Sequence, residues 1–258
     1  YRGSTHGTNE YPFLIDEHGI SVIPVTSLKL DYKSFSDIIS TGLPALDELF
    51  SGQGIFKASS SLITGSAGTA KTILASHFAM SSCKRKEMVL YFSFEESPNQ
   101  LARNMAEIGI KFKPQIKSGL LHIHASRPSL QGLEMHLLVL HKFLTELKPQ
   151  TVIIDPISSL ITLGSSSEVR GMLIRLMDTL KVNEINALFT SLTPKRPAES
   201  NDAILDAVSS LADTWIKLDN EDTANERVRT LSIVKSRGMG HFNGKQHFTI
   251  TNQGILFN

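Results

Sequence analysis

Cysteine is almost absent from this sequence of 258 residues. Cys83 is the single one, so the chain can form neither an internal disulfide nor a cysteine-based metal cluster. Long apolar runs are missing as well, because nothing approaches the roughly 18 consecutive apolar residues that a membrane-spanning helix needs. The first residues carry no signal-peptide pattern, so we expect a cytoplasmic protein with no membrane association.

A strong excess of either charge is also lacking. The net charge is +1, with 26 Lys and Arg residues against 25 Asp and Glu residues. This balance gives no support to general binding of nucleic acid or of an anionic membrane surface, although a local basic patch stays open. The composition is that of an ordinary globular protein, with 41% hydrophobic and 20% charged residues.

Apolar segments of strand length alternate with longer segments of helical pattern along most of the chain. The expected strands are residues 60–64, 87–94, 119–125, 151–154, 186–190 and 213–218. The expected helices are residues 71–85, 97–108, 130–147, 166–183 and 202–211, with a short one within 41–54. This βαβ spacing predicts a mainly parallel sheet covered on both faces. Hairpin patterns near the end of the chain predict additional antiparallel edge strands.

The end of the sequence repeats its beginning. Seven identical residues, among them Arg2, Gly3, Phe13 and Gly19, recur 235 positions later without a gap. Both copies read as an Arg-Gly-x-x-His element followed by two short strands around a tight turn. A period of 235 residues is domain-sized. We therefore expect residues 1–25 to be the tail of a preceding homologous domain plus a linker, and residues 26–258 to form the domain itself. Chance similarity between two hairpins is the alternative.

The segment 65-GSAGTAKT-72 follows the phosphate-loop pattern G-x-x-x-x-G-K-[ST] except at Ala70, where glycine is expected. Backbone N–H groups of such a loop bind phosphate oxygens together with the positive end of the following helix. Lys71 is expected to reach the β- and γ-phosphates, and Thr72 to hold Mg²⁺. Ala70 would be excluded only if its position required a positive φ. The candidate ATP-binding residues are Gly65, Ser66, Ala67, Gly68, Thr69, Ala70, Lys71 and Thr72.

Acidic residues follow two of the expected strands. Asp155 ends 152-VIID-155, at the carboxyl edge of the sheet where an aspartate linked to Mg²⁺ is expected. Glu95 and Glu96 follow the strand that ends at residue 94, and one of them can polarise the attacking nucleophile, with Glu95 also a candidate for the metal. The plainer interpretations are a strand-end aspartate and surface glutamates at the start of a helix.

The order of these motifs resembles the RecA-like ATPases, once 235-KSRGMGH-241 is added as a Lys-x-Arg-Gly-x-x-His element. More narrowly, the chain resembles the KaiC family of circadian-clock ATPases and autokinases. The segments that carry this resemblance are 92-FSFEESPNQLARN-104, 10-EYPFLIDEHGISVIP-24 and 233-IVKSRGMGH-241. It runs along nearly the whole chain and implies the α/β fold of RecA-like P-loop NTPases. That fold is a mostly parallel twisted sheet flanked by helices, with antiparallel hairpins at the C-terminal end.

The resemblance also implies a homohexamer that binds ATP and Mg²⁺ between neighbouring subunits, with regulators of the KaiA/KaiB type. Lys235 and Arg237 would reach the γ-phosphate from the adjacent subunit. Ser209 and Ser210 match the adjacent serine and threonine that the family phosphorylates, although both are serine here. The implied activities are ATP hydrolysis, serine autokinase and autophosphatase, in a circadian clock or a signalling phosphorylation switch. The family's second repeat continues into a tail that regulators grip, whereas this sequence ends at Asn258.

Two other functions stay open on the residues alone. The first is a RecA-like DNA-dependent ATPase, against which the near-zero charge and the lack of basic runs with interleaved aromatic residues both argue. Lys195 and Arg196 are the one modest basic candidate. The second is a non-catalytic nucleotide-sensing scaffold, an alternative that Ala70 keeps open.

Overall fold

The computed structural model describes residues 13–16, 19–22, 33–130, 132–193, 208–222 and 227–258. Lys195, Arg196 and the first Arg-Gly-x-x-His element lie outside the described residues. So does most of the helix expected over residues 202–211, of which residues 208–211 are described and are helical. Within the described part of the chain, no helix combines the length and the apolar character needed to cross a membrane.

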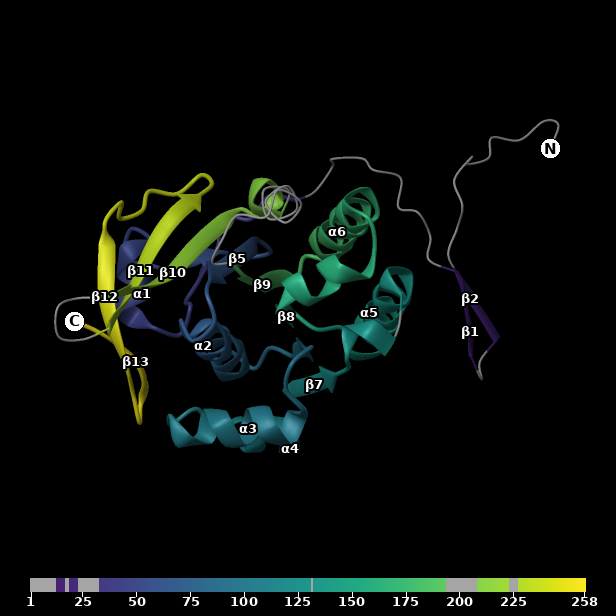
Figure 1. The fold of residues 1–258 in the computed structure, drawn as a ribbon, viewed down its shortest axis with the longest axis horizontal. Coiled ribbons are helices and arrows are strands. Elements are labelled where there is room, and N and C mark those ends of the chain that lie inside the picture. Colours follow the sequence, from purple (N-terminus) through teal and green to yellow (C-terminus); the bar gives the residue numbers. More distant parts are fainter. Residues whose placement is uncertain (1–12, 17–18, 23–32, 131, 194–207, 223–226) are drawn as a thin grey trace.

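A nine-stranded sheet forms the centre of the molecule, in the order β13-β12-β11-β10-β5-β9-β8-β6-β7 (Figure 1). The strands from β10 to β7 are parallel, whereas β11, β12 and β13 extend the sheet by antiparallel pairing. The predicted fold class is therefore confirmed. The strands are β5 (Ser60–Gly65), β6 (Val89–Ser93), β7 (Leu121–Ala125), β8 (Thr151–Asp155), β9 (Asn186–Leu192), β10 (Thr214–Asp222), β11 (Arg227–Ser236), β12 (Lys245–Thr251) and β13 (Gly254–Phe257).

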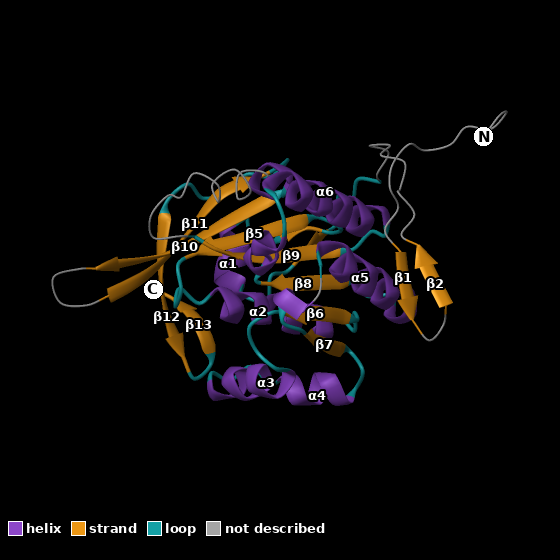
Figure 2. Ribbon diagram, turned by 45° about the vertical axis from the view of Figure 1, so that its right-hand side comes forward, coloured by secondary structure: helices purple, strands orange, loops and turns teal. Residues whose placement is uncertain are grey.

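Helices cover both faces of this sheet, as strands with continuous apolar sequence require (Figure 2). On one face, α2 (Lys71–Lys84), α3 (Pro98–Glu107) and α4 (Phe112–Lys117) pack in a core that contains Tyr91 and Ile153. On the other face, α5 (Leu133–Leu147) and α6 (Ser166–Val182) pack over Leu62 and Val152. The remaining elements are α1 (Pro44–Leu49), the pair β3 (Ile38–Ile39) and β4 (Ile55–Phe56), and the 3₁₀ segments Pro128–Leu130 and Ile157–Leu163.

Two hairpins of the chain share one pairing register. In the first, β1 (Phe13–Asp16) pairs with β2 (Gly19–Val22). Adding 235 to both members of each pair gives all four pairs between β12 and β13. The turn residues Gly19 and Gly254 have φ values of +108° and +97°, a conformation that favours glycine. The internal repeat therefore extends from the sequence to the backbone pairing.

The two hairpins differ in what they pack against. Phe13 is 58% exposed, whereas its counterpart Phe248 is 1% exposed. The second hairpin lies against α2, where the N–H of Ile255 donates to Nε2 of His77 at 3.2 Å. A Cβ atom at Gly254 would come within 2.4 Å of the same ring. Burial lowers the pKa of His77 to about 4, so the ring is a neutral acceptor at pH 7. This contact holds the edge of the sheet on the helix that begins at the phosphate loop.

Candidate nucleotide-binding site

The turn between β5 and α2 has the backbone of a phosphate loop. β5 ends at Gly65 and α2 begins at Lys71. A Cβ atom at Gly65 would lie 2.5 Å from the carbonyl oxygen of Leu218, so the close approach of β10 requires glycine there. Gly68 has a φ of +80°. Because the turn leads directly into a helix N-terminus, its N–H groups stand where proteins bind phosphate.

Ala70 occupies the position where the loop pattern has glycine. Its φ is +78° and its ψ is +23°, which is the left-handed conformation. The positive φ named above as the condition that would exclude alanine is therefore present, and the chain nevertheless places Ala70 in this conformation. A left-handed conformation costs a residue with a Cβ atom about 1–2 kcal/mol. Ala70 is 9% exposed and packs in the core beneath the loop, which offsets part of that cost.

Lys71 begins α2 with its ammonium group turned back toward the loop. Nζ donates to the carbonyl oxygens of Gly65 at 2.9 Å and of Ser66 at 2.8 Å. Burial lowers the pKa of Lys71, while the nearby carboxylates of Asp155 and Glu95 act in the opposite direction. The lysine is thus held at the mouth of the loop, close to the acidic groups of the neighbouring strands.

Asp155 ends β8 and is 7% exposed. Hydroxyl groups from the strands on both sides hold its carboxylate: Tyr91 of β6 donates to Oδ2 at 2.6 Å, and Thr190 of β9 donates to Oδ1. The backbone carbonyl of Asp155 accepts a hydrogen bond from the N–H of Phe94 at 2.9 Å. Burial, followed by the charge of Asp155, raises the pKa of Tyr91 well above its usual value, so the phenol remains a donor.

Glu95 and Glu96 follow β6 and face the same space as Asp155. Nδ2 of Asn104 in α3 donates to Oε2 of Glu96 at 2.6 Å, which fixes that side chain. Burial, and then the charge of Asp155, raises the pKa of Glu95, while Lys71 opposes the shift. A carboxyl group with a raised pKa is the better proton acceptor near neutral pH. Glu95 is therefore the stronger candidate for a general base.

These residues line one cavity of about 390 Å³ at the carboxyl edge of the parallel strands, here called the loop-edge cavity. Its volume is in the range of small-molecule sites. The predicted residues that line it are Ala67, Gly68, Ala70, Lys71, Thr72, Glu95, Glu96 and Asp155. The structure therefore brings together the phosphate loop and all three predicted carboxylates.

The oxygen donors of the loop-edge cavity fit a magnesium ion that arrives with a nucleotide. Mg²⁺ usually takes one or two protein oxygens, with waters and substrate phosphates as its other ligands. The Thr72 hydroxyl and the Asp155 carboxylate are donors of this kind on the walls of the same cavity. The residues present therefore suit the metal that the sequence motif implies.

Lys235 and Arg237 lie toward the amino-terminal ends of β5 and β10, whereas the phosphate loop follows the carboxyl end of β5. Trp215 of β10 pairs with Leu62 of β5 on one side and with Lys235 of β11 on the other. Along the strand direction, Lys235 is therefore three residues away from Gly65, a distance of about 10 Å. The structure does not bring these two cations to the phosphate loop of their own chain.

The two candidate phosphorylation sites lie beside these cations. Nζ of Lys235 donates to the carbonyl oxygen of Ser209, and the guanidinium of Arg237 donates to that of Ser210. Ser209 is 9% exposed, whereas Ser210 is exposed. Burial, and then the charge of Arg237, lowers the pKa of Lys235. Oδ1 of Asp213 lies 3.7 Å from Nη1 of Arg237. The cluster of Ser209, Ser210, Lys235 and Arg237 is called the β11 base below. Here 'base' means the foot of the strand, not a proton acceptor.

Sequence reasoning misses four residues of the site: Tyr91, Asn104, Thr190 and Arg229. Nε of Arg229 in β11 donates to the carbonyl oxygen of Gly68 at 3.3 Å, which brings another cation to the phosphate loop. The available signal for Tyr91 is its hydroxyl group, because a tyrosine within a buried apolar strand needs a partner. The other three residues contact partners that are distant in the sequence or on another element, and no local pattern marks them.

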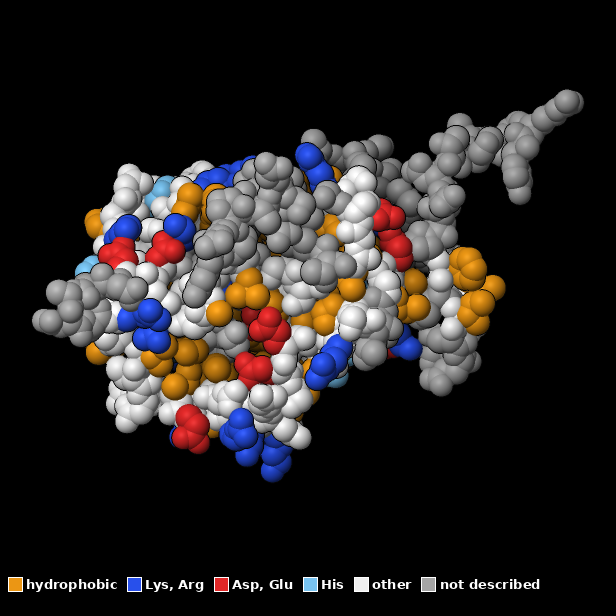
Figure 3. Space-filling view, in the orientation of Figure 1, with side chains coloured by type: hydrophobic (Ala, Val, Ile, Leu, Met, Phe, Trp, Pro, Cys, Tyr) orange, Lys and Arg blue, Asp and Glu red, His pale blue; other side chains and the backbone are white. Residues whose placement is uncertain are grey.

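Among the described residues, basic side chains are not gathered into one stripe on the face shown in Figure 3. In the described part of that face, Lys and Arg occur in small groups among acidic, polar and hydrophobic side chains. Proteins that bind DNA usually carry a basic stripe or patch on one face. This face therefore gives no support to the DNA-dependent alternative.

Comparison with known proteins adds a family to this geometry. The family model that matches is described as "ATPase: KaiC" and covers residues 39–258. Circadian clock protein KaiC2 of Synechocystis sp. (strain ATCC 27184 / PCC 6803 / Kazusa) is 46% identical over 255 residues, which are 99% of this chain and 45% of that protein.

Two further relatives are circadian clock oscillator proteins named KaiC. The protein of Parasynechococcus marenigrum (strain WH8102) is 36% identical over 253 residues, 98% of this chain and 49% of its own length. The protein of Synechococcus elongatus (strain ATCC 33912 / PCC 7942 / FACHB-805) is 34% identical over 254 residues, 98% of this chain and 48% of its own. The chain thus spans about half the length of the curated relatives it matches.

Proposed function

The chain belongs to the KaiC family of ATPases, and from that premise we propose that it binds Mg·ATP and hydrolyses it within a ring of identical subunits. The observation that carries this proposal is the position of Lys71, Thr72, Glu95 and Asp155 on one cavity beside a loop–helix turn. A phosphate cradle, a metal-binding oxygen pair and a base are the parts that phosphoryl transfer needs.

Each residue of the cavity has a role that follows from its chemistry. The loop N–H groups and Lys71 stabilise the charge on the β- and γ-phosphates during transfer. Thr72 and Asp155 would hold Mg²⁺, and the metal would supply positive charge to offset that of the phosphate oxygens. Glu95 takes the proton of the attacking hydroxyl group, and the raised pKa of its carboxyl suits that role. Glu96 is the alternative base.

Lys235 and Arg237 complete the site of a neighbouring subunit in this proposal. Because they lie away from the loop of their own chain, a head-to-tail arrangement would bring the β11 base of one subunit to the loop-edge cavity of the next. Head-to-tail contacts close into rings when the rotation allows it. The family resemblance gives six subunits. Cations supplied in trans stabilise the transition state of phosphoryl transfer.

The same contact would carry the serines of the β11 base to the γ-phosphate, so we include autokinase activity in the proposal. Ser210 is exposed and is the more accessible acceptor, whereas Ser209 is 9% exposed and needs a local opening. A base beside the γ-phosphate can activate either water or a serine hydroxyl. Attack of activated water on the resulting phosphoserine would be the autophosphatase activity.

The matching register of the two hairpins supports a tandem arrangement. We propose residues 1–25 as the end of a preceding homologous domain with its linker, and residues 26–258 as the ATPase and autokinase domain. A cytoplasmic location, regulators of the KaiA/KaiB type and a role in a circadian clock or a signalling phosphorylation switch belong to the same proposal. The names of the relatives, which are circadian clock proteins, support that role.

Incubation with Mg·ATP labelled on the γ-phosphate tests these activities together. We expect release of labelled phosphate, label on Ser210 above Ser209, and a mass of six subunits in the presence of nucleotide. A Ser209→Ala/Ser210→Ala variant should hydrolyse ATP but take up no label. Consumption of ATP without label on either serine of the wild type would contradict the autokinase part alone.

A nucleotide-sensing scaffold without catalysis is the second candidate, and the left-handed conformation of Ala70 favours it. A strained residue between the loop and Lys71 could leave phosphate binding intact while it misplaces the γ-phosphate. Tight nucleotide binding without any phosphate release from the assembled wild type would support the scaffold over the ATPase.

A further inference from the structure

Tyr91 lies at the centre of β6 with its side chain completely buried. Its ring packs edge-on against Phe112, with the two centroids 6.3 Å apart. Its hydroxyl group donates to Oδ2 of Asp155 at 2.6 Å. A phenylalanine would fill the same space, so the hydroxyl group serves the hydrogen bond and not the packing.

The sheet register explains why this hydroxyl reaches that carboxylate. Tyr91 pairs with Ile153 of β8, and Asp155 is two residues further along β8 on the same face. Two strand residues span about 6.6 Å, which is close to the length of a tyrosine side chain beyond its Cβ atom. The parallel pairing of β6 and β8 therefore sets the Tyr91 hydroxyl beside the carboxylate of Asp155.

Both oxygens of this carboxylate are held from opposite sides. Thr190 of β9 donates to Oδ1, and Tyr91 of β6 donates to Oδ2. A carboxylate has about four lone-pair sites, so two hydroxyl donors leave acceptor capacity for other ligands. Asp155 lines the loop-edge cavity, where that remaining capacity is available.

We propose that Tyr91 is a positioning residue for the metal, because its hydroxyl orients the Asp155 carboxylate so that this group and Thr72 receive Mg²⁺ together. The inference rests on the proposed function, since it concerns the metal that enters with ATP. It assigns the tyrosine no contact with the nucleotide. Partners that orient a metal ligand typically contribute 10–100-fold to metal affinity or activity.

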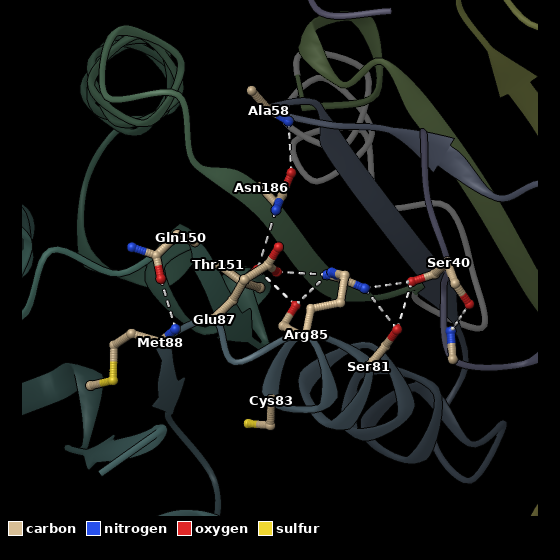
Figure 4. Close-up of polar contacts among 12 residues, drawn as sticks. Ser40, Ala58, Ser81, Cys83, Arg85, Glu87, Met88, Gln150, Thr151 and Asn186 are labelled. Carbon is tan, nitrogen blue, oxygen red and sulfur yellow. Dashed lines mark hydrogen bonds and ion pairs between the residues drawn. The ribbon is translucent and has the colours of Figure 1, made fainter. Parts of the chain in front are cut away.

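A matched control is a second buried hydroxyl pair between α2 and β8, at the ends of these two elements that lie away from Thr72 and Asp155. Ser82 of α2 and Thr151, the first residue of β8, form a buried hydroxyl pair with oxygens 2.9 Å apart. Figure 4 shows Thr151 with Asn186, Arg85 and Glu87 in a polar cluster at this end of the sheet. Ser82→Ala removes one buried hydroxyl group, as Tyr91→Phe does. The partner of Ser82, Thr151, is at the opposite end of β8 from Asp155.

The test measures the affinity of a fluorescent methylanthraniloyl-ATP, with excess MgCl₂ and with EDTA, for wild type, Tyr91→Phe and Ser82→Ala. In Tyr91→Phe we expect the gain in affinity that Mg²⁺ provides to fall about tenfold, with the affinity in EDTA unchanged. Ser82→Ala should keep the full gain. Thr190→Val should behave like Tyr91→Phe, and Thr190→Ser, which retains a donor, should behave like wild type.

Two results would overturn the inference in different ways. Equal loss of affinity with and without Mg²⁺ in both Tyr91→Phe and Thr190→Val would make these hydroxyls structural and leave the proposed ATPase function standing. Absence of analogue binding by the wild type under both conditions would contradict the proposed function and this inference together. If Tyr91→Phe fails to fold, the comparison of Thr190→Val with Thr190→Ser decides the matter.

Discussion

The loop-edge cavity and the β11 base lie toward opposite ends of β5 and β10, and each offers what the other does not. The cavity has a phosphate cradle, a buried lysine and carboxylates around about 390 Å³. The β11 base has Lys235 and Arg237 against the carbonyl groups of Ser209 and Ser210. Under the proposed ring arrangement, each region is half of a site, and a second copy of the chain would bring the halves together.

The cluster around Arg85 is a useful contrast (Figure 4). It is polar and partly buried, but its cation Arg85 already pairs with its own carboxylate Glu87. Arg85 donates to Glu87 at 2.8 Å and to Ser82 at 2.9 Å, and the adjoining cavity measures about 10 Å³. Buried polar groups alone therefore do not identify a functional site. The loop-edge cavity differs from this cluster in two ways: it has space for a ligand, and its charged side chains face that space.

The largest expected effect comes from the β11 base. Arg237→Ala should lower kcat for ATP hydrolysis roughly 10³-fold, because a cation supplied in trans to the γ-phosphate contributes that much. Nucleotide affinity should change little, since the loop and Lys71 remain. Steady-state phosphate release and equilibrium binding of the fluorescent analogue measure the two effects.

Lys245→Ala is the control for Arg237→Ala, since it removes an exposed cation that pairs with Glu221 on the same antiparallel part of the sheet. It should leave kcat unchanged. Full activity in Arg237→Ala would show that the loop-edge cavity is complete without the β11 base. That result would contradict a site shared between these two regions.

A change at the loop edge should affect binding instead. Lys71→Ala should weaken nucleotide binding about 100-fold, the usual order for the loss of a charged hydrogen-bonding partner of a phosphate. The measurement is titration with the fluorescent analogue. Lys84→Ala, at the exposed end of the same helix, should bind as wild type does. Unchanged affinity in Lys71→Ala would show that phosphate binds elsewhere.

Ala70→Gly should have a smaller effect, on stability. Relief of the left-handed conformation should raise the free energy of unfolding by about 0.5–1 kcal/mol, after allowance for the greater chain entropy of glycine. Ala79→Gly, in the helical interior of α2, should lower it by about 1 kcal/mol or more. Urea denaturation measures both variants, and the same sign for both would contradict the strain at residue 70. Hydrolysis that appears only in Ala70→Gly would favour the scaffold.

The smallest expected effect is a shift in the pH dependence of hydrolysis. Because the pKa of Lys235 is lowered, this cation loses its charge at a lower pH than an ordinary lysine, and the rate should fall as pH rises. Lys235→Arg should retain a few-fold more of its own pH 7.5 activity at about pH 9.5, because arginine stays charged. Lys245→Arg is the control, since Glu221 raises the pKa of that lysine. Identical alkaline profiles for wild type and Lys235→Arg would remove Lys235 from the mechanism.

The sequence predicts the parallel sheet, the phosphate loop and the three carboxylates because each depends on a local pattern. The short α4 and the pair β3–β4 escape prediction, since so few residues carry no clear period. The φ of Ala70 could not be read from the sequence, because alanine gives no sign of a left-handed position. Tyr91 and Thr190 meet Asp155 only through the register of β6, β8 and β9. That register follows from the packing of the whole sheet.

Reassembly of rings from two inactive variants tests the central claim most directly. Glu95→Gln/Glu96→Gln disables the loop-edge cavity, and Lys235→Ala/Arg237→Ala disables the β11 base, so each variant alone should be inactive. If the site is shared between subunits, an equal mixture reassembled from separated subunits should recover about a quarter of the wild-type ATPase rate, because one interface in four joins two intact halves. No recovery in mixed rings of normal mass would contradict a site built from two copies of the chain.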